Sequence, residues 1–322
     1  MVRATSVPMP LLVLASGQAG LVSTRQCDDE GLGKDRRHRL VASGRALLVT
    51  SCVLDLQQLL AADGWASSED GPDRQRRRAA CLGLLAHGPR ATAVGAAALV
   101  LLNVQGLPQV ITPEVMLPGR SARRTRAGIV VRRFDPTMPA LGIGPFRVAA
   151  PTWALAQTIC ELDRDHAVAV LDSALQRGTV TRAAFDDVRR LARGRRGAAR
   201  LHDWWHLVDG RSQSPLETRA RLQCIDAGIP PDELQLPLKN AGGRLVALAD
   251  LGWRLRGGRW LVAEIDGAGP HATPQALYRD RERQNAVNET GVVDMLRFTA
   301  EDIGRRSLAT TIKAHLTRDR SR

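Results

Sequence analysis

The sequence has few aromatic residues and few lysines. One tyrosine and four phenylalanines occur among 322 residues, which argues against a protein that binds single strands by stacking bases on aromatic side chains. Only three of the 46 basic residues are lysines, so the excess over the 33 acidic residues, a net charge of +13, is mostly arginine. Arginine suits the phosphates of nucleic acid, although an arginine-rich composition without a functional role explains the same count equally well.

Paired cysteines and long apolar runs are also missing. The five cysteines include no Cys-x-x-Cys pair, which argues against a zinc site and for reduced thiols in a cytoplasmic protein. The apolar run from Ala93 to Val104 is well short of the ~20 residues that cross a bilayer. The N-terminal stretch resembles a signal peptide but has only a short apolar run. We therefore expect no membrane segment and no export.

The apolar content is nevertheless sufficient for more than one folded domain. At 322 residues and 44% hydrophobic, the chain can bury two or three cores. The pattern predicts a multidomain α+β or α/β protein with domains at residues 1–66, 67–211 and 212–322. Residues 212–322 carry 17 bases and 14 acids, so most of the net charge lies on the first 211 residues. If nucleic acid binds, that part supplies most of the general attraction.

Residues 11–56 predict three short helices followed by a stretch rich in strand formers. Three short helices and a β-wing predict a winged helix, whose third helix would enter the major groove of DNA. That helix carries Arg36, Arg37 and Arg39, the predicted DNA-binding residues. A basic face that is only solvated explains these charges at least equally well. Residues 67–211 predict a mixed α/β middle domain without catalytic spacing.

From residue 212 onward the pattern predicts a helix, three strands, a helix, a strand and a closing helix. Ser214 and Glu217 predict a capping box at the start of the first helix. Gly257 and Gly258 predict a hairpin turn between the second and third strands. The second helix is predicted over residues 273–291.

Three acids fall on the two strands of that predicted hairpin. Asp250 lies near the end of one strand, and Glu264 and Asp266 lie two residues apart on its partner, where side chains share a face. We expect the three carboxylates to converge at one edge of the sheet. Hard oxygen ligands on a rigid sheet favour Mg²⁺ or Mn²⁺, and such an ion would offset the repulsion between the acids.

The C-terminal segments resemble the PD-(D/E)XK nuclease superfamily, and within it an endonuclease family similar to very short patch repair endonucleases. The resemblance is carried, in chain order, by "SPLETRARL", "ADLGW", "AEIDGAGPH", "YRDRERQNAV" and "MLRFTAEDI". It implies a restriction-endonuclease-like αβββαβα core. One departure is that Asp266 replaces the lysine of the superfamily's usual Glu-x-Lys, which leaves open what orients the attacking water.

These segments lead to a first hypothesis, a metal-dependent DNA endonuclease. Asp250 and Glu264 would hold the ion, and Asp266 would bind it directly or through water. Glu217 would complete the metal shell, and His271 would donate a proton or grip the phosphate. Arg279 is a candidate for the phosphates of the cleaved strand.

A second hypothesis is a DNA-binding regulator or antitoxin whose nuclease module is inactive. The first two-thirds of the chain resembles, more weakly, the abortive-infection type of antitoxin, which has a winged helix and a middle domain. The presence of all three acids on the strand pair favours the enzyme. The sequence leaves open the nucleic-acid substrate and whether the biological partner is a toxin gene or a repair pathway.

Overall fold

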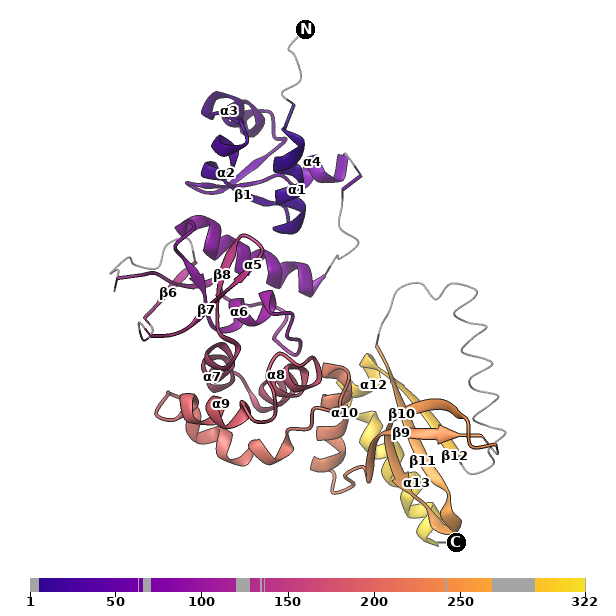
Figure 1. Ribbon diagram of the computed structural model, residues 1–322. Helices are drawn as coiled ribbons and strands as arrows, with labels where there is room; N and C mark the ends of the chain where they lie inside the picture. Colours follow the sequence, from indigo (N-terminus) through magenta and orange to yellow (C-terminus); the bar gives the residue numbers. More distant parts are fainter. Residues whose placement is uncertain are drawn as a thin grey trace. The chain divides into compact units, whose positions relative to one another are not determined.

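The computed structural model describes residues 6–62, 64–65, 71–119, 128–133, 135, 137–240, 242–267 and 293–321. Helices and several sheets alternate along the chain, which confirms the predicted multidomain α+β class at that level. Contacts divide the chain into two compact units (Figure 1). The first comprises Met1–Leu162 and Thr179–Ala199, and the second Asp163–Gly178 and Arg200–Arg322.

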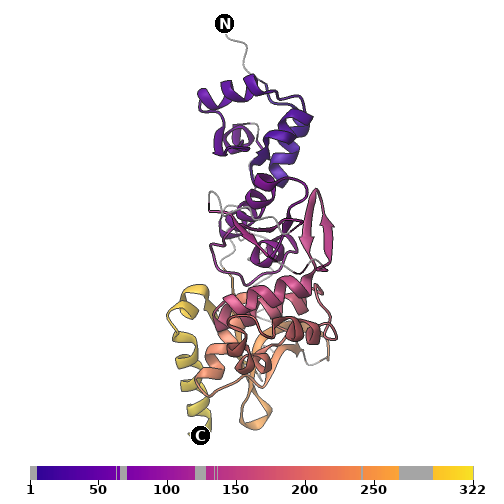
Figure 2. The same cartoon turned by 90° about the vertical axis from the view of Figure 1, so that its left-hand side faces the viewer.

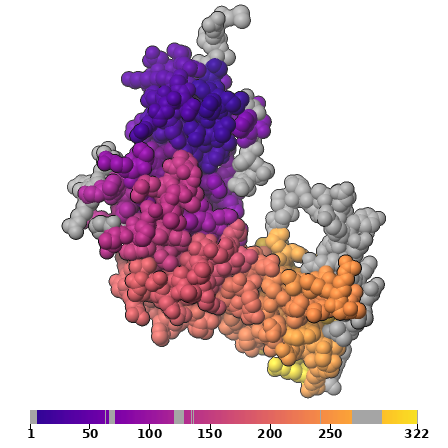
Figure 3. Space-filling view, viewed as in Figure 1, coloured from indigo at the N-terminus to yellow at the C-terminus, as the bar shows by residue number. Residues whose placement is uncertain are grey.

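The first unit begins with short helices around a small sheet. Its elements are α1 (Met9–Gly17), β1 (Leu21–Ser23), α2 (Thr24–Asp29), α3 (Lys34–Ala42), β2 (Leu47–Thr50), β3 (Val53–Asp55) and α4 (Gln57–Ala62). The three predicted helices are present, and the strand-forming stretch is the hairpin β2–β3, in a sheet of order β1-β3-β2. Leu11, Leu40 and Leu54 lie in a common core. The surface of these residues is the indigo region of Figure 3.

The rest of the first unit is a five-stranded sheet with helices. It contains α5 (Pro72–His87), β4 (Thr92–Ala93), α6 (Gly95–Leu101), β5 (Glu114–Met116), β6 (Val130–Arg132), β7 (Ala140–Ile143), β8 (Phe146–Ala149), α7 (Pro151–Glu161) and α9 (Phe185–Ala192). The strand order is β6-β5-β4-β8-β7, and β7 and β8 form the antiparallel ribbon visible in Figure 2. Buried Glu114 on β5 pairs with Arg132 on β6 at 2.6 Å.

The second unit holds the acids of interest. Two short 3₁₀ segments, Ala198–Asp203 and Trp205–Leu207, precede the sheet, and a third, Arg256–Gly258, forms its hairpin turn. The helices and strands are α8 (Arg164–Gln176), α10 (Pro215–Asp226), β9 (Glu233–Lys239), β10 (Leu245–Arg254), β11 (Trp260–Asp266), β12 (Val293–Thr299), α12 (Ala300–Gly304) and α13 (Ser307–Ser321). The sheet order is β12-β11-β10-β9, with β9, β10 and β11 antiparallel and β11 and β12 parallel.

One face of this sheet packs against α10, α12 and α13. Leu251, Trp253 and Leu261 from the strands meet Leu308 and Ile312 from α13 in one buried cluster. Burying a leucine or isoleucine side chain stabilises a fold by roughly 1.5–3 kcal/mol. This face therefore fixes the sheet against the helices.

Three expectations about this region are wrong. Asp250 lies within β10 rather than near its end, and β10 and β11 are the two central strands rather than an edge of the sheet. The closing helix is two helices, α12 and α13, because Arg306 adopts a left-handed φ of 58° between them. The predicted helix over 273–291 lies outside the described residues. Within the described residues, every helix is too short or too polar to be a membrane span.

Candidate active site

Glu217 lies in the first turn of α10, and its carboxylate points toward the sheet. Ser214 is the N-cap residue and accepts a hydrogen bond from the Glu217 backbone N–H at 3.2 Å, as the capping motif predicts. The Glu217 carboxylate, however, does not close the box on Ser214, because it accepts from the backbone N–H of Gln213 at 2.8 Å. Burial, followed by the charge of Asp250, raises the pKa of the Glu217 carboxyl above its ordinary value.

Gln235 on β9 joins Glu217 to Asp250. Its Nε2 donates to Glu217 Oε2 at 3.0 Å and to Asp250 Oδ1 at 3.2 Å. The other Asp250 oxygen, Oδ2, accepts from the backbone N–H of Ile265 on β11 at 2.7 Å. The Gln235 amide therefore holds both Glu217 from α10 and Asp250 from β10. Asp250 is also bonded to the backbone of β11.

The alternation of side chains between the two faces of the sheet is interrupted on β9 and β10 next to Gln235 and Asp250. On β9, Leu234 packs in the helix-facing core whereas Leu236 packs on the opposite face, and on β10 Leu251 and Ala249 divide in the same way. Regular alternation would put residues i and i+2 on one face. Gln235 has a left-handed φ of 53°, which is rare for a residue with a Cβ atom and marks the local break in alternation. The break directs Gln235 toward Glu217 on α10.

Glu264 on β11 contacts β12, the strand that neighbours β11 on the side away from β10. It is 5% exposed, and its Oε2 lies 3.3 Å from Arg297 Nε on β12, with which it is in register. Val262 on β11 packs on the face away from the helices, so Glu264 and Asp266 project to that face as well. Asp266, at the end of β11, is exposed.

The contacts of the acids form two groups. Glu217 and Asp250 form one group around Gln235, and Glu264 with Arg297 forms the other. No group of three or more Asp, Glu, His or Cys side chains in the described part of the chain is arranged to hold a metal ion. Mg²⁺, however, is commonly held by one or two carboxylates with water and substrate phosphates. The Glu217 and Asp250 pair fits such an ion in ligand type and number.

The remaining predicted site residues lie elsewhere. His271 and Arg279 fall outside the described residues. In the first unit, Arg37 on α3 is largely buried and donates to the Leu32 carbonyl at 2.8 Å and to Asp28. Arg36 donates to the Gly31 carbonyl at 3.1 Å.

Arg39, also on α3, is exposed at the surface. Of the three predicted DNA-binding arginines, it is therefore the one whose guanidinium is best placed to meet a ligand from solvent.

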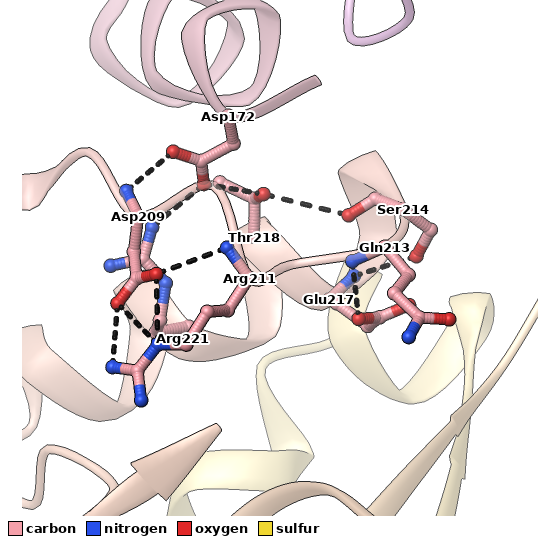
Figure 4. Close-up of polar contacts among 8 residues, drawn as sticks. All are labelled: Asp172, Asp209, Arg211, Gln213, Ser214, Glu217, Thr218 and Arg221. Atoms are coloured by element: carbon pink, nitrogen blue, oxygen red, sulfur yellow. Dashed lines mark hydrogen bonds and ion pairs between the residues drawn. The ribbon is translucent and has the colours of Figure 1, made fainter. Parts of the chain in front are cut away.

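A buried polar network joins α8 to α10, the helix that carries Glu217 (Figure 4). Asp172 accepts from Arg221 Nη2, Thr218 Oγ1 and the backbone N–H of Asp209, at 2.8, 2.8 and 2.7 Å. Burial raises the pKa of Asp172 to about 6, although Arg221 opposes the shift. The network anchors the helix that carries Glu217.

Sequence reasoning missed Gln235 and Arg297 as partners of the acids. Arg297 lies in the quoted "MLRFTAEDI" stretch, so the alternation of β12 could have placed it on the Glu264 face once parallel pairing was assumed. The sequence does not indicate that Gln235 contacts the acids, because these contacts depend on the break in the alternation of β9.

Two Mycobacterium tuberculosis proteins are similar to this chain. They are the uncharacterized proteins MT2308 and Rv2248, each 33% identical over 174 residues. The match covers 53% of this chain and 62% of each relative, so the chain spans less than two thirds of their length. No protein-family model matches the chain. Neither relative's name states an activity, so the functional conclusion rests on the residues of the site.

Proposed function

We propose that the protein is a metal-dependent DNA endonuclease with a winged-helix targeting region. The observation that carries the proposal is the pair of carboxylates from α10 and β10 that share one amide beside the central strand β11. Glu217 is 7% exposed, and a buried acid held this close to a second acid is costly unless a partner offsets its charge. A divalent cation bound to substrate phosphate is such a partner.

Glu217 and Asp250 would hold the ion, and Glu264 stays a predicted ligand from the next strand. When bound, the ion would lower the pKa of a coordinated water and offset charge on the phosphate. Asp250 is fixed by the Ile265 N–H and Glu264 by Arg297, so both acids are oriented before substrate arrives. Such orientation limits the reorganisation that the reaction needs.

The order of elements in the second unit supports a restriction-endonuclease-like core. One helix precedes an antiparallel three-strand meander, a fourth strand lies parallel to the third, and helices follow it. In the first unit, three helices and the hairpin β2–β3 support a winged helix, with Arg39 on the third helix. The first unit would supply most of the attraction for DNA.

The alternative is a DNA-binding regulator with an inactive nuclease module. One specific observation favours it: Gln235 and Arg297 already give the acids polar partners that belong to the chain itself. An inactive scaffold would keep these contacts without using an ion.

Incubation of the full chain with supercoiled plasmid tests the proposal. We expect nicked or linear product with Mg²⁺ or Mn²⁺ and none with excess chelator. DNA binding without cleavage under every ion condition would favour the regulator.

A further inference from the structure

Gln235 holds a backbone conformation that glutamine seldom adopts. Its φ of 53° lies in the left-handed region, where a Cβ atom crowds the backbone. The side chain in return makes three hydrogen bonds, since its Oε1 accepts from Gln213 Nε2 at 2.9 Å while its Nε2 donates to Glu217 and Asp250. Strained residues that persist with specific polar contacts mark candidate functional positions.

The position of the Gln235 amide nitrogen is the informative part of this arrangement. It lies 3.0 Å from Glu217 Oε2 and 3.2 Å from Asp250 Oδ1, so both hydrogens of one neutral NH₂ group are directed at acids. A neutral amide offsets the repulsion between two carboxylates less than a cation does. The amide therefore occupies the place between the oxygens where a positive charge would be most favourable.

We propose that Gln235 is a positioning residue whose amide holds the Glu217 and Asp250 carboxylates together in the metal-free protein, and that a divalent cation displaces this amide when it binds. This inference rests on the proposed function. Since the amide must leave both carboxylates, binding of the ion breaks two hydrogen bonds to charged groups. Gln235 therefore weakens metal binding while it keeps the site assembled.

Calorimetric titration of the full chain with Mn²⁺ tests the displacement. Gln235→Gly removes the amide and accepts the left-handed φ without strain, and Gln235→Ala removes the amide while keeping a Cβ atom. We expect both variants to bind Mn²⁺ at least about fivefold more tightly than the parent, because no amide competes for the carboxylates. In chelator, both should melt at a lower temperature than the parent and gain more from added Mn²⁺.

Gln213→Ala is the matched control. It removes an amide from the same cluster, but Gln213 contacts Asp250 only through Gln235. Its Mn²⁺ affinity should stay within about twofold of that of the parent. This change is well below the change in affinity expected from the loss of one hydrogen bond to a charged group.

Equal or weaker Mn²⁺ binding by both Gln235 variants would overturn the inference, and weaker binding would make Gln235 itself a ligand. If the parent binds Mn²⁺ and cleaves plasmid while the variants bind it equally well, the inference alone fails. If neither parent nor variants bind Mn²⁺, the displacement and the metal dependence of the proposed function fail together.

Discussion

Asp172 on α8 and Arg221 on α10 form a buried ion pair, with 2.8 Å between Oδ2 and Nη2. Their side chains are 1% and 6% exposed. Removing one partner of such a pair leaves the other charge in the interior without compensation. The pair therefore fixes α10, and with it Glu217, against the rest of the second unit.

Asp172→Ala should destabilise the protein by about 3–5 kcal/mol at neutral pH, because it removes the shared acceptor of Arg221, Thr218 and the Asp209 N–H and leaves Arg221 buried without a partner. Thr218→Val is the control, since it removes one hydrogen bond to Asp172 and should cost about 1 kcal/mol. Urea unfolding measures both. A cost for Asp172→Ala no larger than that for Thr218→Val would mean that the pair does not anchor α10.

The stability should also depend on pH through Asp172. Its pKa is about 6 in the folded protein against an ordinary value of 3.8, so the folded state binds the proton more tightly than the unfolded state. The free energy of unfolding therefore falls as the pH rises from about 4 to about 6, by up to about 3 kcal/mol from this group.

Unfolding of the parent and of Asp172→Asn across that pH range measures this contribution. The parent should gain stability relative to Asp172→Asn as the pH falls from about 6 to about 4, because only the parent has a carboxyl group that takes up a proton in this range. Parallel curves for parent and variant would contradict the raised pKa.

Arg37 and Arg39 should behave differently when each is replaced by alanine. Arg39 is exposed, so Arg39→Ala should weaken binding of the full chain to duplex DNA several-fold and reduce the salt dependence by about one phosphate contact. Arg37→Ala should instead lower the melting temperature, because Arg37 bonds the Leu32 carbonyl and Asp28. Anisotropy titrations at several salt concentrations would refute the prediction if Arg39→Ala bound like the parent.

Local signals predicted much of this fold. The capping serine at 214 and the glycine turn at 257–258 marked the ends of α10, β10 and β11 because caps and turns depend on neighbouring residues. The break between α12 and α13 was missed, since Arg306 takes a left-handed φ that its residue type does not signal.

The site was less accessible to prediction, because its geometry depends on contacts between distant segments. The sequence placed Glu264 and Asp266 on one face of a strand, but the direction of Asp250 depends on the break in alternation on β9 and β10. A run of arginines does not show which guanidinium turns inward, and Arg37 does so because the carbonyl of Leu32 lies within its reach.

Metal-dependent plasmid cleavage by Asp250→Asn and Glu217→Gln tests the central claim most directly. Both substitutions keep the shape of the side chain and remove one charge from the carboxylate pair. We predict that the parent cleaves with Mg²⁺ or Mn²⁺, that neither variant does, and that both variants still bind DNA nearly as the parent does. Cleavage by Asp250→Asn at the rate of the parent, or no cleavage of duplex, nicked or single-stranded DNA by the parent with either ion, would contradict the account.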